Sequence, residues 1–286
     1  MIDSINQHTI HSASIEDRQQ LANLVHFGAL IHRHLDWRTP LDWIGHQPFL
    51  CASYMGTLSA ALACPPDPPG VAWIRLFAVS AGQSSDPLWQ DLWAAALGQL
   101  RKRNGSVHVA AIPLQNWFIH LLTASSFTTN HSVIVLTWDD HHLPKASPNS
   151  SLALRPMVLD DIPAVEKIDT LAFGGVWQNS QACLEIAFRQ SALATIADLD
   201  GALVGYQIST ATQMGGHLAR LAVLPGYQGR GIGYALVYDT LTQFERRGGR
   251  SVTVNTQNIN TISLNLYQKA GFRLTGEEYP VYEFFT

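Results

Sequence analysis

The sequence predicts an α/β fold with a mixed sheet, and it predicts two copies of that fold in tandem. Two observations support this. Apolar residues change repeatedly between alternating and helical spacing along the chain. One order of predicted elements occurs twice, before and after a segment at 139–151 that is rich in small polar residues and proline and is typical of a linker. The two predicted domains are residues 1–145 and 146–286.

The first half contains the more diverged copy. It is predicted to form, in order, a helix at 15–30, strands at 49–54, 58–64 and 71–79, a helix at 88–103, a strand at 107–112, a helix at 117–123 and a strand at 132–138. Its long helix ends at Arg103-Asn104-Gly105, which matches Arg247-Gly248-Gly249 in the second half. Such repetition at fixed spacing indicates an internal duplication.

The second half begins with a predicted strand at 152–156. Asp160, Asp161 and Pro163 are typical of a helix start. Ile162, Val165, Ile168 and Leu171 follow at helical spacing, which predicts that they share one apolar face. A second helix is predicted at 181–190.

A hairpin and an alternation of strands and helices complete the second half. The strands at 193–199 and 203–211 flank Asp200-Gly201, a strong hairpin signal. A strand at 217–224 leads into a helix at 231–248, whose predicted inward residues are Ala235, Leu236, Tyr238, Leu241 and Phe244. The last predicted elements are a strand at 251–256, a helix at 261–270 and a strand at 279–285.

Composition excludes several classes of protein. Of the 286 residues, 14% are charged and the formal net charge is −4, so no basic surface for nucleic acid is expected. No apolar run approaches the ~18 residues of a membrane span, and the first ten residues do not resemble a signal peptide. We therefore expect a cytoplasmic protein with no membrane or nucleic-acid partner.

Metal ligation is not expected. Three cysteines at long spacings argue against a disulfide framework and a zinc site and favour buried thiols: Cys51, Cys64 and Cys183. The spacing of His32, His34 and Asp36 could ligate a metal, but no third cluster supports it, and a solvated loop is the favoured interpretation.

The densest glycine cluster follows the strand at 217–224 and precedes a helix. It comprises Gly226, Gly229, Gly231 and Gly233. A strand, a glycine loop and a helix N-terminus together form a common phosphate site, because small residues let backbone N–H groups approach the anion and the helix dipole favours its charge. The spacing is neither that of a P-loop nor that of a dinucleotide fold.

The loop is similar to the coenzyme A motif of the Gcn5-related N-acetyltransferase (GNAT) superfamily. Gln228, Gly231 and Gly233 give the pattern Gln-x-x-Gly-x-Gly. The resemblance continues with Asn260, Ser263, Leu266-Tyr267, Lys269 and Gly271-Phe272, and it extends over residues 152–285. It implies two tandem GNAT-like modules. The first has one glycine and an acidic Asp86 where the loop would be, so it is expected to lack a coenzyme site.

The resemblance implies a set of residues around acetyl-CoA. The coenzyme-binding candidates are Leu221, Ala222, Val223, Gln228, Gly229, Arg230, Gly231, Ile232, Gly233, Asn260, Ser263, Tyr267 and Lys269. Tyr267 matches the tyrosine that protonates the leaving sulfur, although it could be only a packing residue. Asn260 could equally be the N-cap of its helix.

The base and the acceptor wall are further expectations from the resemblance. His217 is the candidate base because family members carry Glu or His on this strand, and we expect it to share a face with Ala219, Leu221 and Val223. Gly215-Gly216 could instead leave it solvent-exposed, and ordered water could replace it. Phe173 and Trp177 are the acceptor-wall candidates.

The predicted function is acetyl-CoA-dependent N-acetylation of a primary amine in a small molecule or peptide. Asn255 stands where protein N-terminal acetyltransferases often carry Glu, which argues against that substrate class. Two alternatives stay open: a non-catalytic acyl-CoA-binding module, and an acyltransferase for longer acyl-CoA. A monomer is favoured over a homodimer, because two modules in one chain can imitate a dimer.

Overall fold

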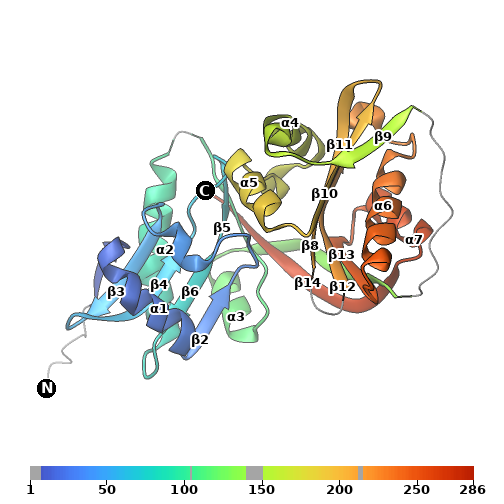
Figure 1. Cartoon of the computed structure of the whole chain (residues 1–286). Helices are drawn as coiled ribbons and strands as arrows, with labels where there is room; N and C mark the ends of the chain where they lie inside the picture. The colour runs from blue at the N-terminus through green and yellow to red at the C-terminus, as the bar shows by residue number, and fades with distance from the viewer. Residues whose placement is uncertain (1–7, 104, 140–150, 212–214) are drawn as a thin grey trace, which may run out of the picture. The chain divides into compact units, whose positions relative to one another are not determined.

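The computed structural model describes residues 8–103, 105–139, 151–211 and 215–286. Most of the predicted linker lies outside these residues. The chain forms two compact units (Figure 1). The first unit is Met1–Asn130 with Val281–Thr286, and the second is His131–Pro280.

These units differ from the predicted ranges 1–145 and 146–286 because a strand of each half pairs in the other unit. Strand β8 (Thr128–Trp138) belongs to the first half of the sequence, yet Val133–Trp138 pair with β13 (Ser251–Gln257) in the second unit. The end of β14 (Arg273–Phe285) pairs with β7 (His108–Ala111) in the first unit.

The first unit contains short strands and three α-helices among its described residues. Its elements are β1 (Thr9–Ser12), α1 (Arg18–Phe27), β2 (Leu30–Arg33), β3 (Phe49–Tyr54), β4 (Thr57–Ala63), β5 (Val71–Trp73), β6 (Leu76–Val79), α2 (Ser85–Arg101), β7 and α3 (Asn116–Ala124), with 3-10 turns at Ile15–Asp17 and Pro40–Trp43. One sheet has the order β1-β3-β4-β6-β2.

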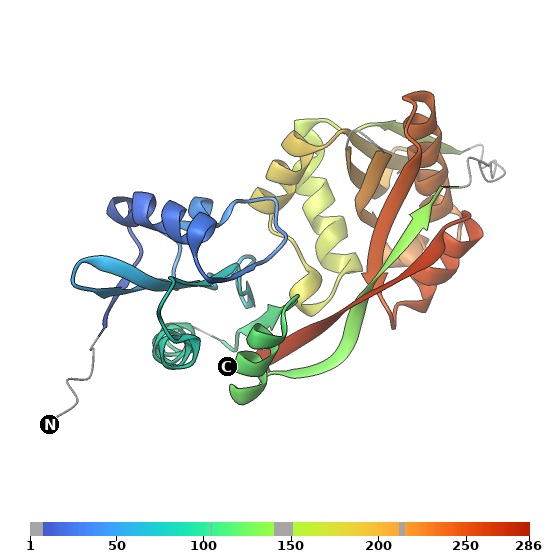
Figure 2. The same ribbon diagram turned by 90° about the horizontal axis from the view of Figure 1, so that it is seen from below.

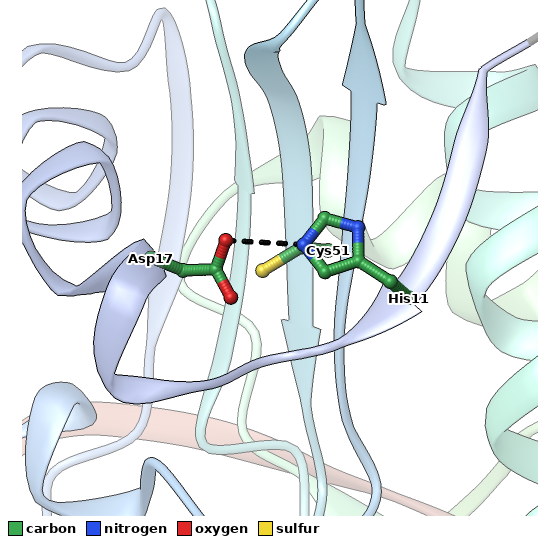
Figure 3. A group of neighbouring side chains, drawn as sticks. All are labelled: His11, Asp17 and Cys51. Carbon is green, nitrogen blue, oxygen red and sulfur yellow. Dashed lines mark hydrogen bonds and ion pairs between the residues drawn. The ribbon is translucent and has the colours of Figure 1, made fainter.

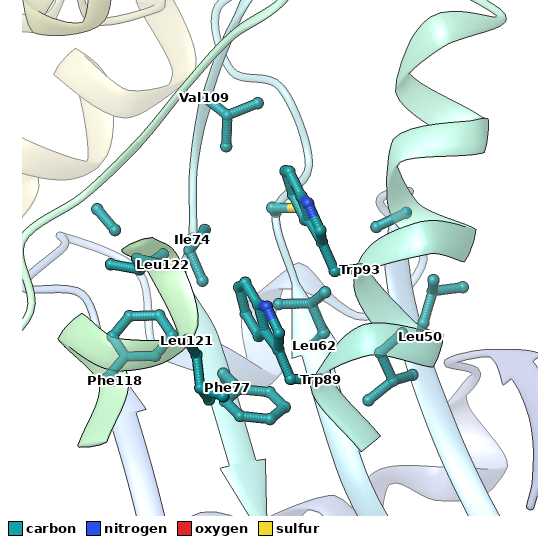
Figure 4. Packing of buried hydrophobic residues seen from close by; sticks show 14 of the residues in the cluster. Leu50, Leu62, Ile74, Phe77, Trp89, Trp93, Val109, Phe118, Leu121 and Leu122 are labelled. Atoms are coloured by element: carbon teal, nitrogen blue, oxygen red, sulfur yellow. The ribbon is translucent and has the colours of Figure 1, made fainter. Parts of the chain in front are cut away.

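Strict alternation along the strands places helices on both faces of that sheet (Figure 2). Phe49 and Cys51 of β3 pack with α1, whereas Leu50 and Ala52 of the same strand pack with α2 and α3. The cluster between the sheet and helices α2 and α3 is the larger of the two and is rich in aromatic rings (Figure 4). Trp89 and Trp93 of α2, for example, stack 5.7 Å apart.

Two predicted elements of the first unit are wrong in detail. The helix at 15–30 ends at Phe27, and a strand, β2, begins at Leu30. The strand at 71–79 is broken at Ile74 and Arg75: β5 pairs with β7 in parallel, whereas β6 pairs with β4 and β2. Strand β1 was not predicted at all.

The second unit has one sheet with helices on both faces (Figure 1). The strand order is β14-β8-β13-β12-β11-β10-β9. Its remaining elements are β9 (Leu152–Pro156), α4 (Ile162–Ala172), α5 (Gln181–Gln190), β10 (Leu193–Leu199), β11 (Ala202–Ala211), β12 (Gly215–Val223), α6 (Ile232–Arg246) and α7 (Thr261–Lys269), with 3-10 turns at Leu159–Asp161, Gly175–Trp177 and Pro225–Tyr227.

The hairpin turn and the buried faces of helices α4 and α6 can be compared directly with the predictions. Asp200 and Gly201 both have positive φ, as the predicted tight turn requires. Leu171 is 63% exposed, so the predicted apolar face of α4 ends at Ile168. In α6 the buried side chains include Leu236, Leu241 and Phe244 as predicted, but Val237 and Thr240 take the places expected for Ala235 and Tyr238.

The fold class is confirmed as mixed α/β with a repeated order. The elements β3, β4, β5–β6, α2, β7, α3, β8 recur as β10, β11, β12, α6, β13, α7, β14. The three cysteines are free and buried, as predicted. Within the described part of the chain, no helix is long and apolar enough to cross a bilayer.

Candidate active site

The central feature of the second unit is a parallel strand pair that separates. Strands β12 and β13 pair only from Gly215 to Leu218 and from Ser251 to Val254. Beyond these residues β12 continues to Val223 paired with β11, and β13 continues to Gln257 paired with β8, which it joins from Val252 onward. The pairing ends before the glycine loop, so the edge of β12 that faces away from β11 has no strand partner at Leu221, Ala222 and Val223 among the described residues.

Glycines make the tight end of this pair possible. A Cβ on Gly215 would lie 2.0 Å from the carbonyl oxygen of Ser251, and one on Gly216 would lie 2.4 Å from the ring of Phe244. Both glycines are buried and His217 beside them is half-buried, so the alternative of a solvent-exposed His217 is wrong. They allow β12 to lie directly against β13 and α6.

A β-bulge at Ala219 lies where the two strands separate. Ile208 of β11 is opposite Arg220, and Ser209 is opposite Leu218, so Ala219 has no partner. A bulge changes which face the following side chains point to. Leu218 and Leu221 consequently pack on the same face of the sheet, with α6, although they are three residues apart.

The glycine loop has a conformation that only glycine adopts easily. Gly229 and Gly231 have φ of +75° and +82°, and Gly231 is the N-cap residue of α6. No side chain caps this helix, and no acidic residue lies in its first turn. The first turn of α6 therefore offers backbone N–H groups and a positive dipole end on an exposed loop.

These properties fit the pyrophosphate of coenzyme A. The Gln228 amide donates to the carbonyl oxygen of Val223 at 3.1 Å and so ties the loop to the strand. Ile232 is buried beneath the helix start, and a Cβ on Gly233 would lie 3.2 Å from Leu266 of α7. Arg230 is exposed beside the ring of Tyr227.

Helix α7 contributes the second part of the predicted motif. Asn260 accepts the backbone N–H of Ser263 at 3.1 Å, so it is the N-cap of α7. Tyr267 is 5% exposed and packs on Phe272; its burial raises the pKa of the phenol above the usual value and keeps the hydroxyl protonated. Lys269 lies over the ring of Tyr234.

The prediction that His217 shares a strand face with Leu221 and Val223 is wrong. Because Leu218 packs with α6, the neighbouring His217 points to the opposite face, where Arg220 also lies, and the bulge sends Leu221 and Val223 away from it. Its Nδ1 lies 2.9 Å from Oγ1 of Thr253. Burial lowers the pKa of His217 below its usual value, so the ring is neutral at neutral pH.

The connection between α4 and α5 lies on this second face and contains Phe173 and Trp177. The ring of Trp177 contacts His131 at 5.9 Å between centroids. Arg220 lies over the ring of Phe173, 3.6 Å from its centroid, and forms a bidentate ion pair with Asp169 of α4. The sequence analysis missed both Arg220 and Asp169, because buried charges that pair across elements have no motif in one sequence.

The first unit contains two histidine groups. The prediction of a solvated loop is wrong for the first group: His32 is buried, stacks on Phe118 and reaches the carbonyl oxygen of Ile74, while Asp36 pairs with Arg75. Burial lowers the pKa of His32 to about 4. These side chains are held by internal contacts.

The second group brings three potential metal ligands together (Figure 3). One atom each of His11, Asp17 and Cys51 lies within 4.8 Å of the others. Asp17 is already bonded to His11 and to the backbone N–H of Ser14, as in a capping box. Burial raises the pKa of the Cys51 thiol to about 12, which favours the neutral form over the thiolate that binds metals.

Comparison with known proteins gives a family match for part of the chain and a similar fold for the whole. Residues 162–272 match the acetyltransferase (GNAT) family. No curated protein matches the chain. Among solved structures, a GCN5-related N-acetyltransferase from Sphaerobacter thermophilus is 17% identical over 97% of this chain and 95% of its own, with a TM-score of 0.62.

Two further structures are similar in fold. A tandem GNAT protein from the clavulanic acid biosynthesis pathway is 17% identical over 97% of this chain and 98% of its own, with a TM-score of 0.62. A GCN5-related N-acetyltransferase from Anabaena variabilis is 15% identical over 97% and 72%, with a TM-score of 0.68. Residues 162–272 thus match the GNAT family model, and the fold of the whole chain is similar to that of a tandem GNAT protein.

Proposed function

We propose that this protein transfers the acetyl group of acetyl-CoA to a primary amine of a small molecule or peptide, at a site in the second unit. The observation that carries the proposal is the separation of β12 from β13 beyond Leu218 and Val254, directly before the uncapped N-terminus of α6. An extended thioester substrate needs an unpaired strand edge for its arm and an open helix N-terminus for its phosphates.

Each residue of the site has a proposed role. The backbone of Leu221, Ala222 and Val223 would bind the pantetheine arm, and the loop Gln228–Gly233 would bind the pyrophosphate. Acetyl-CoA supplies the activated acyl group. His217, neutral at neutral pH, would take the proton of the amine directly or through water, and Tyr267 would donate a proton to the departing sulfur.

The test is release of free coenzyme A. The protein is incubated with acetyl-CoA and a panel of aliphatic amines, arylamines and peptides, and thiol release and the acetylated product are measured. Acetylation of one class of amine is expected. Tight coenzyme binding without turnover on any amine would instead support the binding module, and a preference for longer acyl-CoA would support the other alternative.

We further propose that the first unit does not bind the coenzyme. The segment between β6 and α2 has one glycine, and Asp86 lies in the first turn of α2, where its charge opposes an anion. Calorimetric titration is expected to give one acetyl-CoA per chain. Two equivalent sites per chain would overturn this assignment.

A further inference from the structure

Arg220 is the charged side chain that links the coenzyme strand to the α4–α5 connection. It lies on β12, immediately after the bulge at Ala219, and its side chain is 13% exposed. Its Nε and one terminal nitrogen donate to the two carboxylate oxygens of Asp169, at 2.8 and 2.9 Å. Asp169 itself is fully buried.

The same guanidinium holds the connection at two further points. A terminal nitrogen donates to the carbonyl oxygen of Trp177, and the plane of the guanidinium covers the ring of Phe173. Arg220 thereby contacts both residues that the sequence analysis selected for the acceptor wall. A single side chain on β12 therefore fixes the two ends of a five-residue segment.

Asp169 extends this network to neighbouring elements. It accepts the backbone N–H of Asn179 at 2.9 Å, which fixes the chain after Trp177. The hydroxyl of Tyr206 on β11 also donates to it. Burial raises the pKa of Tyr206, so this hydroxyl stays protonated and remains a donor. The carboxylate is satisfied from three directions.

We propose that Arg220 is the positioning residue for the acceptor: it holds Phe173 and Trp177 in register with the strand whose edge is proposed to bind the coenzyme. The inference rests on the proposed function. Leu221, the next residue, begins the strand edge that is proposed to bind the pantetheine arm, so the same strand would position both the acyl donor and the acceptor wall. Small displacements of a bound reactant cost large factors in rate.

The network requires arginine. A planar guanidinium can make the paired bonds to Asp169, reach the Trp177 carbonyl and stack on Phe173 at the same time. A lysine ammonium keeps the charge that neutralises Asp169 but cannot make this set of contacts. Arg220→Lys therefore separates the positioning role from simple charge neutralisation, and it avoids the buried unpaired carboxylate that Arg220→Met would leave.

The experiment compares Arg220→Lys and Arg220→Met with a matched control, Arg189→Met. Arg189 is an exposed arginine of α5 that pairs with Glu185. Hydrogen exchange of the apo and acetyl-CoA-bound proteins is measured by mass spectrometry. In both Arg220 variants, exchange is expected to rise at least ~10-fold in the segment 173–180 while the strands β10 and β11 stay protected. The control is expected to match the wild type.

Kinetics give the second measurement. For Arg220→Lys we expect KM for the amine to rise at least ~10-fold, with the dissociation constant of acetyl-CoA within about 2-fold of wild type. Unchanged exchange at 173–180, or equal loss of protection throughout the unit, would overturn the inference. If exchange rises only at 173–180 in the Arg220 variants but the wild type acetylates no amine, the proposed function is refuted and the linkage through Arg220 stands.

Discussion

Tyr267 and His217 differ in what burial does to their protons. Burial raises the pKa of the phenol and lowers that of the imidazole, so at neutral pH the phenol keeps its proton and the imidazole is uncharged. The proposed roles, a base that takes a proton from an amine and an acid that gives one to a thiolate, require these protonation states. Each role can be tested with one substitution.

Tyr267→Phe removes the hydroxyl and keeps the ring that packs on Phe272. We expect kcat to fall by about 10²-fold, the low end for a general acid, because a coenzyme thiolate is a fair leaving group. The dissociation constant of acetyl-CoA is expected to change little. Tyr279→Phe, which alters a tyrosine bonded to Glu277, is the control. Full kcat in Tyr267→Phe would leave this residue a packing role only.

The lowered pKa of His217 sets the sign of the pH dependence. The imidazole is a base above its pKa, so kcat/KM should stay high at neutral pH and fall with acid through a pKa below the usual 6.5. The measurement uses an arylamine whose amino group stays neutral over the pH range of the titration, so that only groups of the protein titrate. His217→Gln, which can still bond Thr253, should lower kcat/KM and abolish its fall with acid. If kcat/KM of this variant still falls with acid, the titrating group is another residue.

At the scale of elements, the loop between β12 and α6 combines two requirements. Its backbone must pass through positive φ at Gly229 and Gly231, and its helix must begin without a side-chain cap. Ser, Thr, Asp or Asn would be preferred at an ordinary helix start. An exposed helix start without a side-chain cap leaves its backbone N–H groups open to an anion, as the proposed function requires.

Gly231→Asp tests that interpretation against Gly231→Asn. Both residues tolerate positive φ to a similar degree and have nearly the same size, so they differ mainly in charge. We expect the aspartate variant to bind acetyl-CoA at least ~10-fold more weakly, or ~1.4 kcal/mol, than the asparagine variant. Isothermal titration gives both constants. Equal affinities would show that no phosphate lies at this helix end.

The sequence predicted the helices, strands and turns better than the face of the sheet on which a side chain lies. The glycine loop, the N-cap Asn260 and the hairpin at Asp200-Gly201 follow from local chemistry, and the structure contains them where expected. The face of His217 depends on a bulge at Ala219, which no local pattern in β12 indicates. The strand break at Ile74 and Arg75 is similar, because two partners compete for one apolar run.

At the scale of the whole molecule, the two halves of the sequence each donate a strand. Linear composition could indicate a linker at 139–151, but it could not show that β8, which precedes this linker, completes the sheet of the second unit. Leu136 and Trp138 of β8 are fully buried among Val252, Val254 and Tyr267. The repeated order of elements therefore gives no sign that the last strand of the first half pairs in the second unit.

This exchange predicts what truncation does. A fragment of residues 146–286 lacks β8, so it leaves β13 unpaired on one edge and uncovers the core that Leu136 and Trp138 fill. Two large apolar side chains contribute about 2–3 kcal/mol each, against a total stability of roughly 5–15 kcal/mol. The lost strand ladder adds to this.

We expect 146–286 to show no cooperative unfolding transition and no acetyl-CoA binding, and we expect a fragment of residues 128–286 to recover both. Circular dichroism during urea unfolding, with calorimetric titration of acetyl-CoA, measures each property. Cooperative unfolding and full affinity in 146–286 would show that the second unit does not need the strand from the first half.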